Sequence, residues 1–244
     1  MAERSSTMPA WLADWMSGEG ISLWGVADLR GLATPLSKNG TPFQYGISFA
    51  LPVDRDIMAA VRNGPTHPYA AEYVRLNNRI DLLGNALAAE FVRRGLGAKP
   101  LPASQRTDWV HITGEFPQKT VATRAGLGWI GRNCQLVTRA HGPWVRLGSV
   151  FTGMALPCAT PVEESNCGSC TRCVEACPSG ALKGAVWRAG LPREAMLDVA
   201  VCDRWKKEHY AKYEDGHVCG ICSASCPFGL KTLRQSPAAP AIPL

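Results

Sequence analysis

Apolar side chains recur with a helical period in two segments of the chain. Residues 8–18 carry them at i, i+3, i+4, i+7 and i+8, which predicts a short amphipathic helix. Residues 68–94 repeat them over a much longer stretch, and Gly95 and Gly97 follow directly after it. The N-terminal part of the chain is therefore expected to contain one short and one long helix.

Short apolar runs between turn-forming residues indicate strands. The runs that predict strands are residues 21–27, 45–52, 109–113 and 145–151. Residues 99–102 are expected to be extended, and residues 119–126 to form a short helix or turn. Helices mixed with short strands predict an α+β core.

Composition places the chain among ordinary globular proteins, with 46% hydrophobic and 19% charged residues. No apolar stretch approaches the roughly 18 residues that span a bilayer, and the N-terminus lacks an export signal. We therefore expect a cytoplasmic protein with no membrane partner. A proline-rich stretch at residues 156–166 predicts a boundary between a core at 1–155 and a module at 156–233, with a disordered tail at 234–244.

Eight of the ten cysteines are crowded into the C-terminal third of the chain. In a chain with no export signal, such crowding indicates metal binding rather than disulfides. Residues 167–178 read C-x2-C-x2-C-x3-C-P, the bacterial ferredoxin spacing in which the fourth cysteine serves the other cluster. Residues 219–227 read C-x2-C-x3-C-P and lack one cysteine, which Cys202 would supply.

This spacing predicts two [4Fe–4S] clusters whose ligands exchange between the two runs. The expected ligands are Cys167, Cys170, Cys173 and Cys226 for the first cluster, and Cys177, Cys202, Cys219 and Cys222 for the second. Pro178 is expected in the first turn of a helix, where its missing N–H costs nothing. The alternative is a pair of zinc ribbons, which also use C-x2-C pairs but do not need the x3-C-P tail twice.

Two further features qualify the cysteine pattern. Cys134 and Cys158 lie outside the runs and read as buried or incidental thiols. The formal charge of +6 counts cysteines as neutral, whereas each thiolate-held cluster carries about −2. The basic balance is therefore a weak indication of a nucleic-acid partner.

Residues 123–133 form the most glycine-dense stretch outside the cysteine runs. Gly126, Gly128 and Gly131 fit G-x-G-x-x-G, but the stretch does not lie in a clear βαβ unit with a following acidic residue. A tight turn is the simpler reading than a dinucleotide site, because glycines allow close backbone approach.

The glycine stretch AGLGWIGRN, the block HGPWVRLGSVFT at residues 141–152 and the two cysteine runs together resemble the epoxyqueuosine reductase family, which is related to the reductive dehalogenases. The resemblance extends from about residue 43 to 229. It implies a nitroreductase-like α+β core that binds cobalamin, followed by a bacterial ferredoxin-like module with two [4Fe–4S] clusters. The cofactor-binding residues that it implies are Gly126, Leu127, Gly128, Trp129, Ile130, Gly131, Arg132 and Asn133.

The resemblance also implies candidate catalytic residues at the start of the long helix. The family has an acidic motif there, and the matching segment is AAEYV at residues 70–74, with Glu72 as a candidate proton donor. Arg79 lies two helical turns further along the same face and is a candidate contact for the cobalt face or the substrate. The alternative is that Glu72, Arg75 and Arg79 form surface helix pairs.

The leading expectation is an iron–sulfur reductase that uses cobalamin and acts on a small-molecule substrate. Its electrons would come from a low-potential donor of the ferredoxin or flavodoxin type. One alternative is a non-catalytic electron carrier or reductive activator of a corrinoid partner, and another is a reductase of epoxyqueuosine in tRNA. The chain ends soon after Cys226 and carries an altered acidic motif, and both features disfavour the tRNA alternative.

Overall fold

The computed structural model describes residues 7–234, which divide into two compact units of three chain segments each. Within the described residues, unit 1 comprises 7–51, 77–127 and 146–162, and unit 2 comprises 52–76, 128–145 and 163–234. The sequence predicts a single domain boundary near residue 155, and that boundary stays a prediction. Of the predicted tail, residues 235–244 lie outside the described part.

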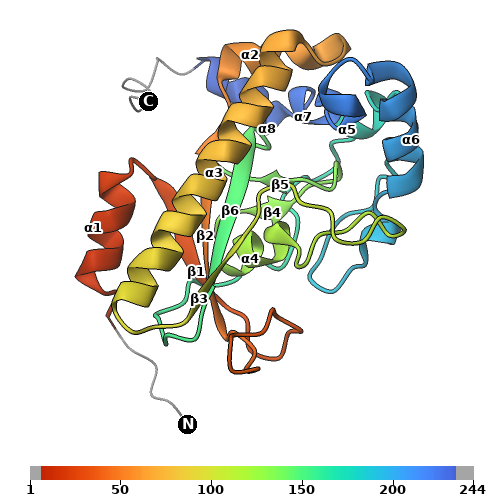
Figure 1. The fold of residues 1–244 in the computed structure, drawn as a ribbon. Helices are drawn as coiled ribbons and strands as arrows, with labels where there is room; N and C mark the ends of the chain where they lie inside the picture. Colours follow the sequence, from red (N-terminus) through yellow and green to blue (C-terminus); the bar gives the residue numbers. More distant parts are fainter. Residues whose placement is uncertain (1–6, 235–244) are drawn as a thin grey trace. The chain divides into compact units, whose positions relative to one another are not determined.

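Unit 1 is built on a four-stranded sheet. Its strands are β1 (Leu23–Asp28), β2 (Tyr45–Pro52), β6 (Val145–Thr152) and β3 (Ala98–Leu101), which neighbour one another in that order (Figure 1). β1 is antiparallel to β2, and β3 is antiparallel to β6. Ile47 and Phe49 are fully buried, and so is Ser48 on the other face of β2. Both faces of β2 are covered, which explains its continuous apolar run.

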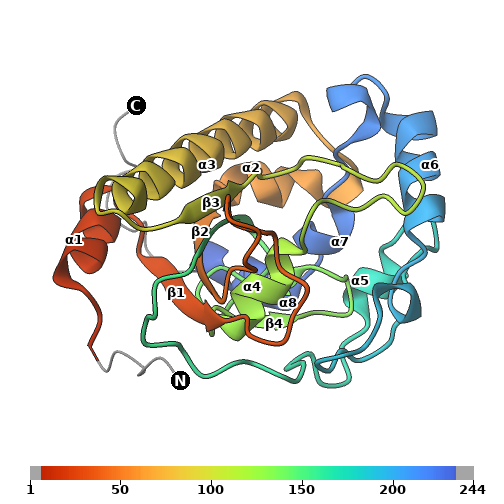
Figure 2. The same cartoon turned by 60° about the horizontal axis from the view of Figure 1, so that its bottom comes forward.

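Helices α1 (Ala10–Gly18) and α4 (Gln118–Arg124) and the unit 1 part of α3 (His67–Arg93), residues 77–93, cover this sheet. Figure 2 shows α3 and α4 on opposite sides of it. The ring of Trp11 in α1 meets Phe91 of α3 edge-on at 5.0 Å between centroids. On the other side, a Cβ at Gly25 would lie 2.2 Å from the carbonyl oxygen of Ala125. Glycine is therefore required where the end of α4 meets β1.

Unit 2 consists mainly of short helices and turns. Its elements are α2 (Arg55–Ala59), η1 (Ala60–Asn63), β4 (Trp129–Ile130), β5 (Leu136–Val137), α5 (Arg172–Glu175), η2 (Arg193–Ala195), α6 (Val199–Tyr210), η3 (Glu214–Gly216), α7 (Ile221–Ala224), α8 (Pro227–Leu230) and η4 (Lys231–Arg234). Trp144 donates from Nε1 to the carbonyl of Ser223 at 2.8 Å. A Cβ at Gly229 would lie 2.4 Å from that indole nitrogen. The segment after β5 is thus held tightly against α7 and α8.

Most of the predicted elements are present. The helices expected at 8–18 and 68–94 correspond to α1 and α3, and the strands expected at 21–27, 45–52 and 145–151 correspond to β1, β2 and β6. The extended segment at 99–102 is β3, and the short helix at 119–126 is α4. The α+β fold class is confirmed. No helix in the described part of the chain is both long enough and apolar enough to cross a membrane.

The strand predicted at residues 109–113 is wrong, because these residues form a turn. The carboxylate of Asp108 accepts hydrogen bonds from the amides of Val110 and His111, each at 2.9 Å. Ile112 then adopts a left-handed conformation with φ 53°. Trp109 and Val110 are 67% and 85% exposed, so the alternation that resembled a strand does not reflect a buried face.

The helix predicted at Pro178 is also absent. The amide of Gly180 donates to the carbonyl of Cys177 at 3.2 Å, and Gly180 has φ 65°, so the chain turns instead of continuing as a helix. The equivalent proline of the second run, Pro227, does begin a helix, with Cys226 as the N-cap of α8.

Candidate metal centre

Four cysteines from two distant segments of unit 2 surround one cavity. Cys167 and Cys170 precede α5, Cys173 lies within it, and Cys226 caps the N-terminus of α8. The cavity has a volume of about 110 Å³, well above the roughly 10–15 Å³ that holds one water. Its remaining walls are Arg132, Asn133, Val137, Pro227 and Phe228. The structure thus brings together the four thiols expected around the first cluster.

Two buried thiols of this first group, Cys173 and Cys226, disfavour the charged form when no metal is bound. Burial raises the pKa of Cys173 to about 11, and the charges of Cys226, Cys167 and Cys170 add to the effect. Burial also raises the pKa of Cys226. Metal ligation requires thiolates, so a bound cationic centre would relieve this repulsion and release protons.

The four thiols expected around the second cluster lie close enough for their charges to interact. Burial raises the pKa of Cys219 to about 11, and the charges of Cys202 and Cys177 contribute. Burial likewise raises the pKa of Cys222, and the charges of Cys219, Cys202 and Cys177 raise it further. These thiols come from the turn after α5, from α6 and from the start of α7. Gly220, next to Cys219, has φ 83° and packs against η1, because a Cβ there would lie 2.7 Å from Val61 Cγ1.

Cys177 differs from the other thiols in its group. Burial would raise its pKa, but hydrogen bonds from the Ser179 hydroxyl and from the amides of Leu182, Ser179 and Ala181 outweigh burial and lower the pKa. Such donors stabilise a thiolate, the form that ligates metal. Cys177 belongs to the first run but interacts with the second group, whereas Cys226 of the second run lines the first cavity.

The two remaining cysteines differ in exposure. Cys134 is 3% exposed and has a left-handed conformation with φ 57°. It lies close enough to Cys202 to contribute to the raised pKa of that thiol. Cys158 is exposed and lies in unit 1. In the described residues, no three histidine, cysteine or acidic side chains already converge on the position of a single metal ion.

Local packing accounts for the glycines of the predicted cofactor loop. A Cβ at Gly128 would lie 2.2 Å from the carbonyl oxygen of Val137, across the β4–β5 hairpin. A Cβ at Gly131 would lie 2.7 Å from Asn133 Oδ1 and 3.5 Å from the sulfur of Cys167. The second half of the loop therefore runs beside the first thiol group, and Arg132 and Asn133 reach its cavity. Residues 126–130 do not line that cavity.

Two buried nitrogens of this loop lack a hydrogen-bond acceptor within the described residues. They are Nε of Arg132 and Nε1 of Trp129. The other guanidinium nitrogens of Arg132 donate to the carbonyls of Gly184 and Gly168, the latter at 2.8 Å. Four thiols and an unpartnered buried N–H around one cavity fit an iron–sulfur cluster, which offers both iron for the thiolates and sulfur as an acceptor.

Glu72 and Arg79 make contacts with different partners. Glu72 is 7% exposed and its Oε2 and Oε1 accept from Arg75 Nε and Nη2 at 2.7 and 2.9 Å. This hydrogen-bonded pair raises the pKa of Arg75. Arg79 instead pairs with Glu19, the residue after α1, at 2.7 Å. The i,i+3 pair of the surface alternative is thus present, although its acid is buried.

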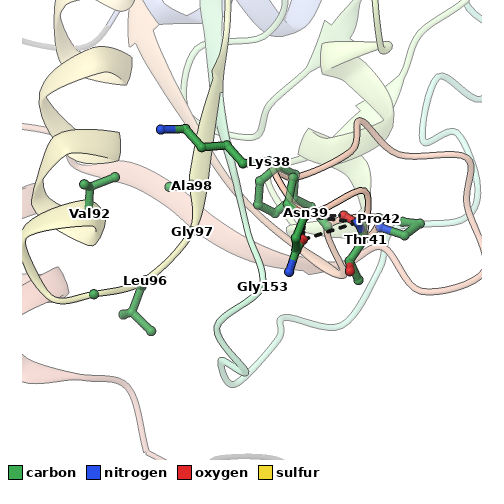
Figure 3. A pocket seen from close by; sticks show the side chains of 12 residues that line it. Lys38, Asn39, Thr41, Pro42, Val92, Leu96, Gly97, Ala98 and Gly153 are labelled. Atoms are coloured by element: carbon green, nitrogen blue, oxygen red, sulfur yellow. Dashed lines mark hydrogen bonds between the residues drawn. The ribbon is translucent and has the colours of Figure 1, made fainter.

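Unit 1 contains a separate and larger cavity of about 570 Å³ (Figure 3). It lies between the loop that precedes β2 and the end of α3, and Lys38 is the charged side chain among its lining residues. Figure 3 shows Lys38 extending toward Ala98, and the amide of Thr41 donating to Asn39 Oδ1 at 3.4 Å. None of the predicted site residues lines it.

Comparison with known proteins identifies relatives of both the module and the chain. Residues 166–229 match the family model of a 4Fe-4S double cluster binding domain. The chain is 39% identical to an epoxyqueuosine reductase of Gloeobacter violaceus over 50% of this chain and 39% of that protein. It is 26% identical to one of Synechococcus sp. over 99% of this chain and 70% of that protein. The chain spans about two fifths of the first of these relatives.

Solved structures share the fold. A reductive dehalogenase described as performing B12-dependent dehalogenation has a TM-score of 0.66 at 17% identity, covering 86% of this chain and 30% of its own. An epoxyqueuosine reductase in complex with a tRNA-Tyr epoxyqueuosine-modified stem loop has a TM-score of 0.57 at 20% identity. The match covers 91% of this chain and 65% of that one. The resemblance inferred from the sequence is confirmed, and the family model supports two [4Fe–4S] clusters.

Proposed function

We propose that this chain, which resembles the epoxyqueuosine reductases, is an iron–sulfur reductase that uses two [4Fe–4S] clusters. Cys167, Cys170, Cys173 and Cys226 hold the first cluster, and Cys177, Cys202, Cys219 and Cys222 hold the second. The observation that carries the proposal is the gathering of the thiols into two groups of four, with Cys177 and Cys226 exchanged between the runs. That exchange is the ferredoxin arrangement.

The two groups also lie near one another within unit 2. The pKa of Cys222 is raised by burial and by its own group, and the charge of Cys173 from the first group adds to the effect. Bound clusters supply one-electron transfer, and a bound cobalamin supplies a strongly reducing metal centre. The role of the protein is to hold these thiolates, exclude water and set the potentials.

The reductase would use cobalamin and act on a small-molecule substrate. The fold shared with a B12-dependent dehalogenase and the similarity to epoxyqueuosine reductases support this step. Residues 126–133 would lie against the corrin, and a ferredoxin or flavodoxin would supply electrons. Glu72 would deliver a proton, which requires its carboxylate to leave Arg75, and Arg79 would contact the substrate.

Anaerobic reconstitution tests the cluster assignment. We expect about eight iron atoms per chain, four for each cluster, with a broad absorbance and two interacting EPR signals after reduction. Cys226→Ser should remove the first cluster's signal and Cys177→Ser the second's. Cys158→Ser is the matched control, because this exposed thiol lies outside both groups. A colourless protein with stoichiometric zinc would refute the assignment.

Gel filtration after incubation with hydroxocobalamin tests the finer proposal. Retained corrinoid with an altered spectrum supports it, and loss of all corrinoid rejects it.

Turnover of a reducible small molecule by dithionite-reduced protein alone identifies an enzyme, whereas a requirement for a partner protein identifies a carrier. Turnover of epoxyqueuosine in a tRNA stem loop would instead identify the tRNA substrate of the relatives.

The role of Glu72 has its own test. Glu72→Gln should lower turnover by about 10²–10⁴-fold while leaving the cluster spectrum unchanged, because an amide cannot donate the acidic proton. Arg75→Gln is the comparison, since it frees the carboxylate without removing the acid. Unchanged turnover in Glu72→Gln would assign this pair to helix structure.

A further inference from the structure

The side chain of Arg132 is fixed beside the first thiol group by two backbone carbonyls. Its Nη2 donates to Gly168, the residue after Cys167, at 2.8 Å, and its Nη1 donates to Gly184. These contacts join residues 36 and 52 positions apart in the chain. The planar guanidinium therefore has little freedom to turn, and the direction of its remaining donor is set.

That remaining donor is left without a partner. Nε of Arg132 is buried and meets no acceptor within residues 7–234. Buried N–H groups are almost always satisfied in folded proteins, and an unsatisfied donor on a charged group is especially unfavourable. A partner is therefore expected from a group that the protein binds.

The place of this donor identifies the partner. Arg132 lines the cavity formed by Cys167, Cys170, Cys173 and Cys226. The backbone just before it runs close to Cys167, because a Cβ at Gly131 would lie 3.5 Å from that sulfur. The acceptors that an iron–sulfur cluster would bring into this cavity are its sulfide and thiolate sulfurs.

We infer that Arg132 donates a hydrogen bond from Nε to a sulfur of the first cluster and thereby raises the reduction potential of that cluster. Reduction adds an electron to the cluster, so a cationic N–H donor stabilises the reduced form more than the oxidised form. The inference rests on the proposed function, since it requires a cluster among these four thiols. It gives Arg132, one of the residues proposed to lie against the corrin, a contact with the first cluster.

The second group has a different cationic neighbour. The positive charge of Lys206 favours the thiolate form of Cys202 and Cys219. Its Nζ also donates to the carbonyl of His217 at 3.2 Å and lies 3.9 Å from the carboxylate of Asp203. Its charge is therefore shared with protein acceptors. Arg132 by contrast keeps one buried donor for the first cluster alone, which predicts that the first cluster is the easier of the two to reduce.

Redox titration followed by EPR tests the inference. The first cluster is identified as the signal that is lost in Cys226→Ser. Arg132→Lys, which keeps a cation but loses the fork, should make its reduction at least tenfold less favourable, a shift of about 59 mV to lower potential for one electron. The second cluster should keep its potential. Arg139→Ala, at an exposed arginine of the same unit, should move neither.

A second measurement needs no substitution in the cluster environment. In the unsubstituted protein with arginine labelled by ¹⁵N at Nε, pulsed EPR of the reduced first cluster should detect one ¹⁵N coupling. Absence of that coupling, or an unchanged potential in Arg132→Lys with both clusters present, overturns the inference and leaves the proposed function intact. Failure of the unsubstituted protein to bind any cluster overturns both.

Discussion

The two units of this chain obtain their structure in different ways. Unit 1 has strands of up to eight residues and a fully buried apolar core that includes Ile47, Phe49, Phe91 and Phe151. In unit 2, α5, α7 and α8 have four residues each and carry or flank the cysteines. Helices this short do not form on their own in water. Apolar burial therefore specifies unit 1, whereas unit 2 depends strongly on what its thiols bind.

Removing the clusters should give the largest difference between the units. After iron is stripped from the protein, we expect amide protection in α5, α7 and α8 to fall by on the order of 100-fold or more, because metal binding and folding are coupled. Protection in β2 and β6 should change little. Hydrogen exchange measured before and after stripping checks this, and an equal loss in both units would contradict the comparison.

A substitution at Gly25 should destabilise unit 1 without involving the thiols. In Gly25→Ala the new Cβ would lie 2.2 Å from the backbone oxygen of Ala125, so strand or helix must shift. We expect the free energy of unfolding to fall by about 2–3 kcal/mol, as for other overpacked sites. Urea denaturation followed by tryptophan fluorescence measures it. Gly18→Ala is the control, because a Cβ at Gly18 meets nothing within 4 Å.

The N-cap of α6 offers a smaller perturbation that is confined to unit 2. The side chain of Asp198 accepts from the amide of Val201 at 3.0 Å. Asp198→Ala should cost about 1 kcal/mol of stability, the usual value of such a cap. The loss should be visible in amide exchange of α6 and absent from β2. Glu208→Ala, an exposed acid on the same helix, serves as the control, and an equal effect there would exclude capping as the cause.

The smallest expected effect concerns acid sensitivity in unit 1. The hydrogen bond from Arg30, opposed in part by burial, lowers the pKa of Asp28 below its ordinary value of 3.8. A lowered carboxyl pKa contributes stability above pH 3.8, and that contribution is lost as the pH falls further. For this partly exposed pair we expect about 0.2–1 kcal/mol. Denaturation between pH 6 and pH 3 should show it as a slope, which Asp28→Asn removes.

The elements that the sequence predicts most directly are those with a long periodic signal. The 27 residues of α3 and the apolar runs of β2 and β6 have such a signal. The turn at residues 109–113 was mistaken for a strand because Asp108 bonds to backbone amides, an interaction that polarity patterns do not register. α6 lacks an apolar stripe, since its buried residue is Asp203, and only the cap at Asp198 marked its start.

In the candidate site, too, some features are predictable from the sequence and others are not. The cysteine spacing predicts that Cys226 joins Cys167, Cys170 and Cys173, and these four thiols do line one cavity, because a cluster fixes the intervals between its ligands. The buried donor of Arg132 could not be foreseen, since its orientation depends on the carbonyls of Gly168 and Gly184, far along the chain. Spacing rules describe ligands, whereas the groups that tune a metal centre come from tertiary structure.

The position of Cys226 as the N-cap of α8 has a consequence for biosynthesis. A growing chain contains Cys167, Cys170 and Cys173 well before the ribosome has added Cys226, the fourth thiol that lines the cavity. Until then the nascent polypeptide contains only three of the four thiols. Iron delivered early would meet an incomplete cage, so loading of the first centre is expected to follow translation of α8.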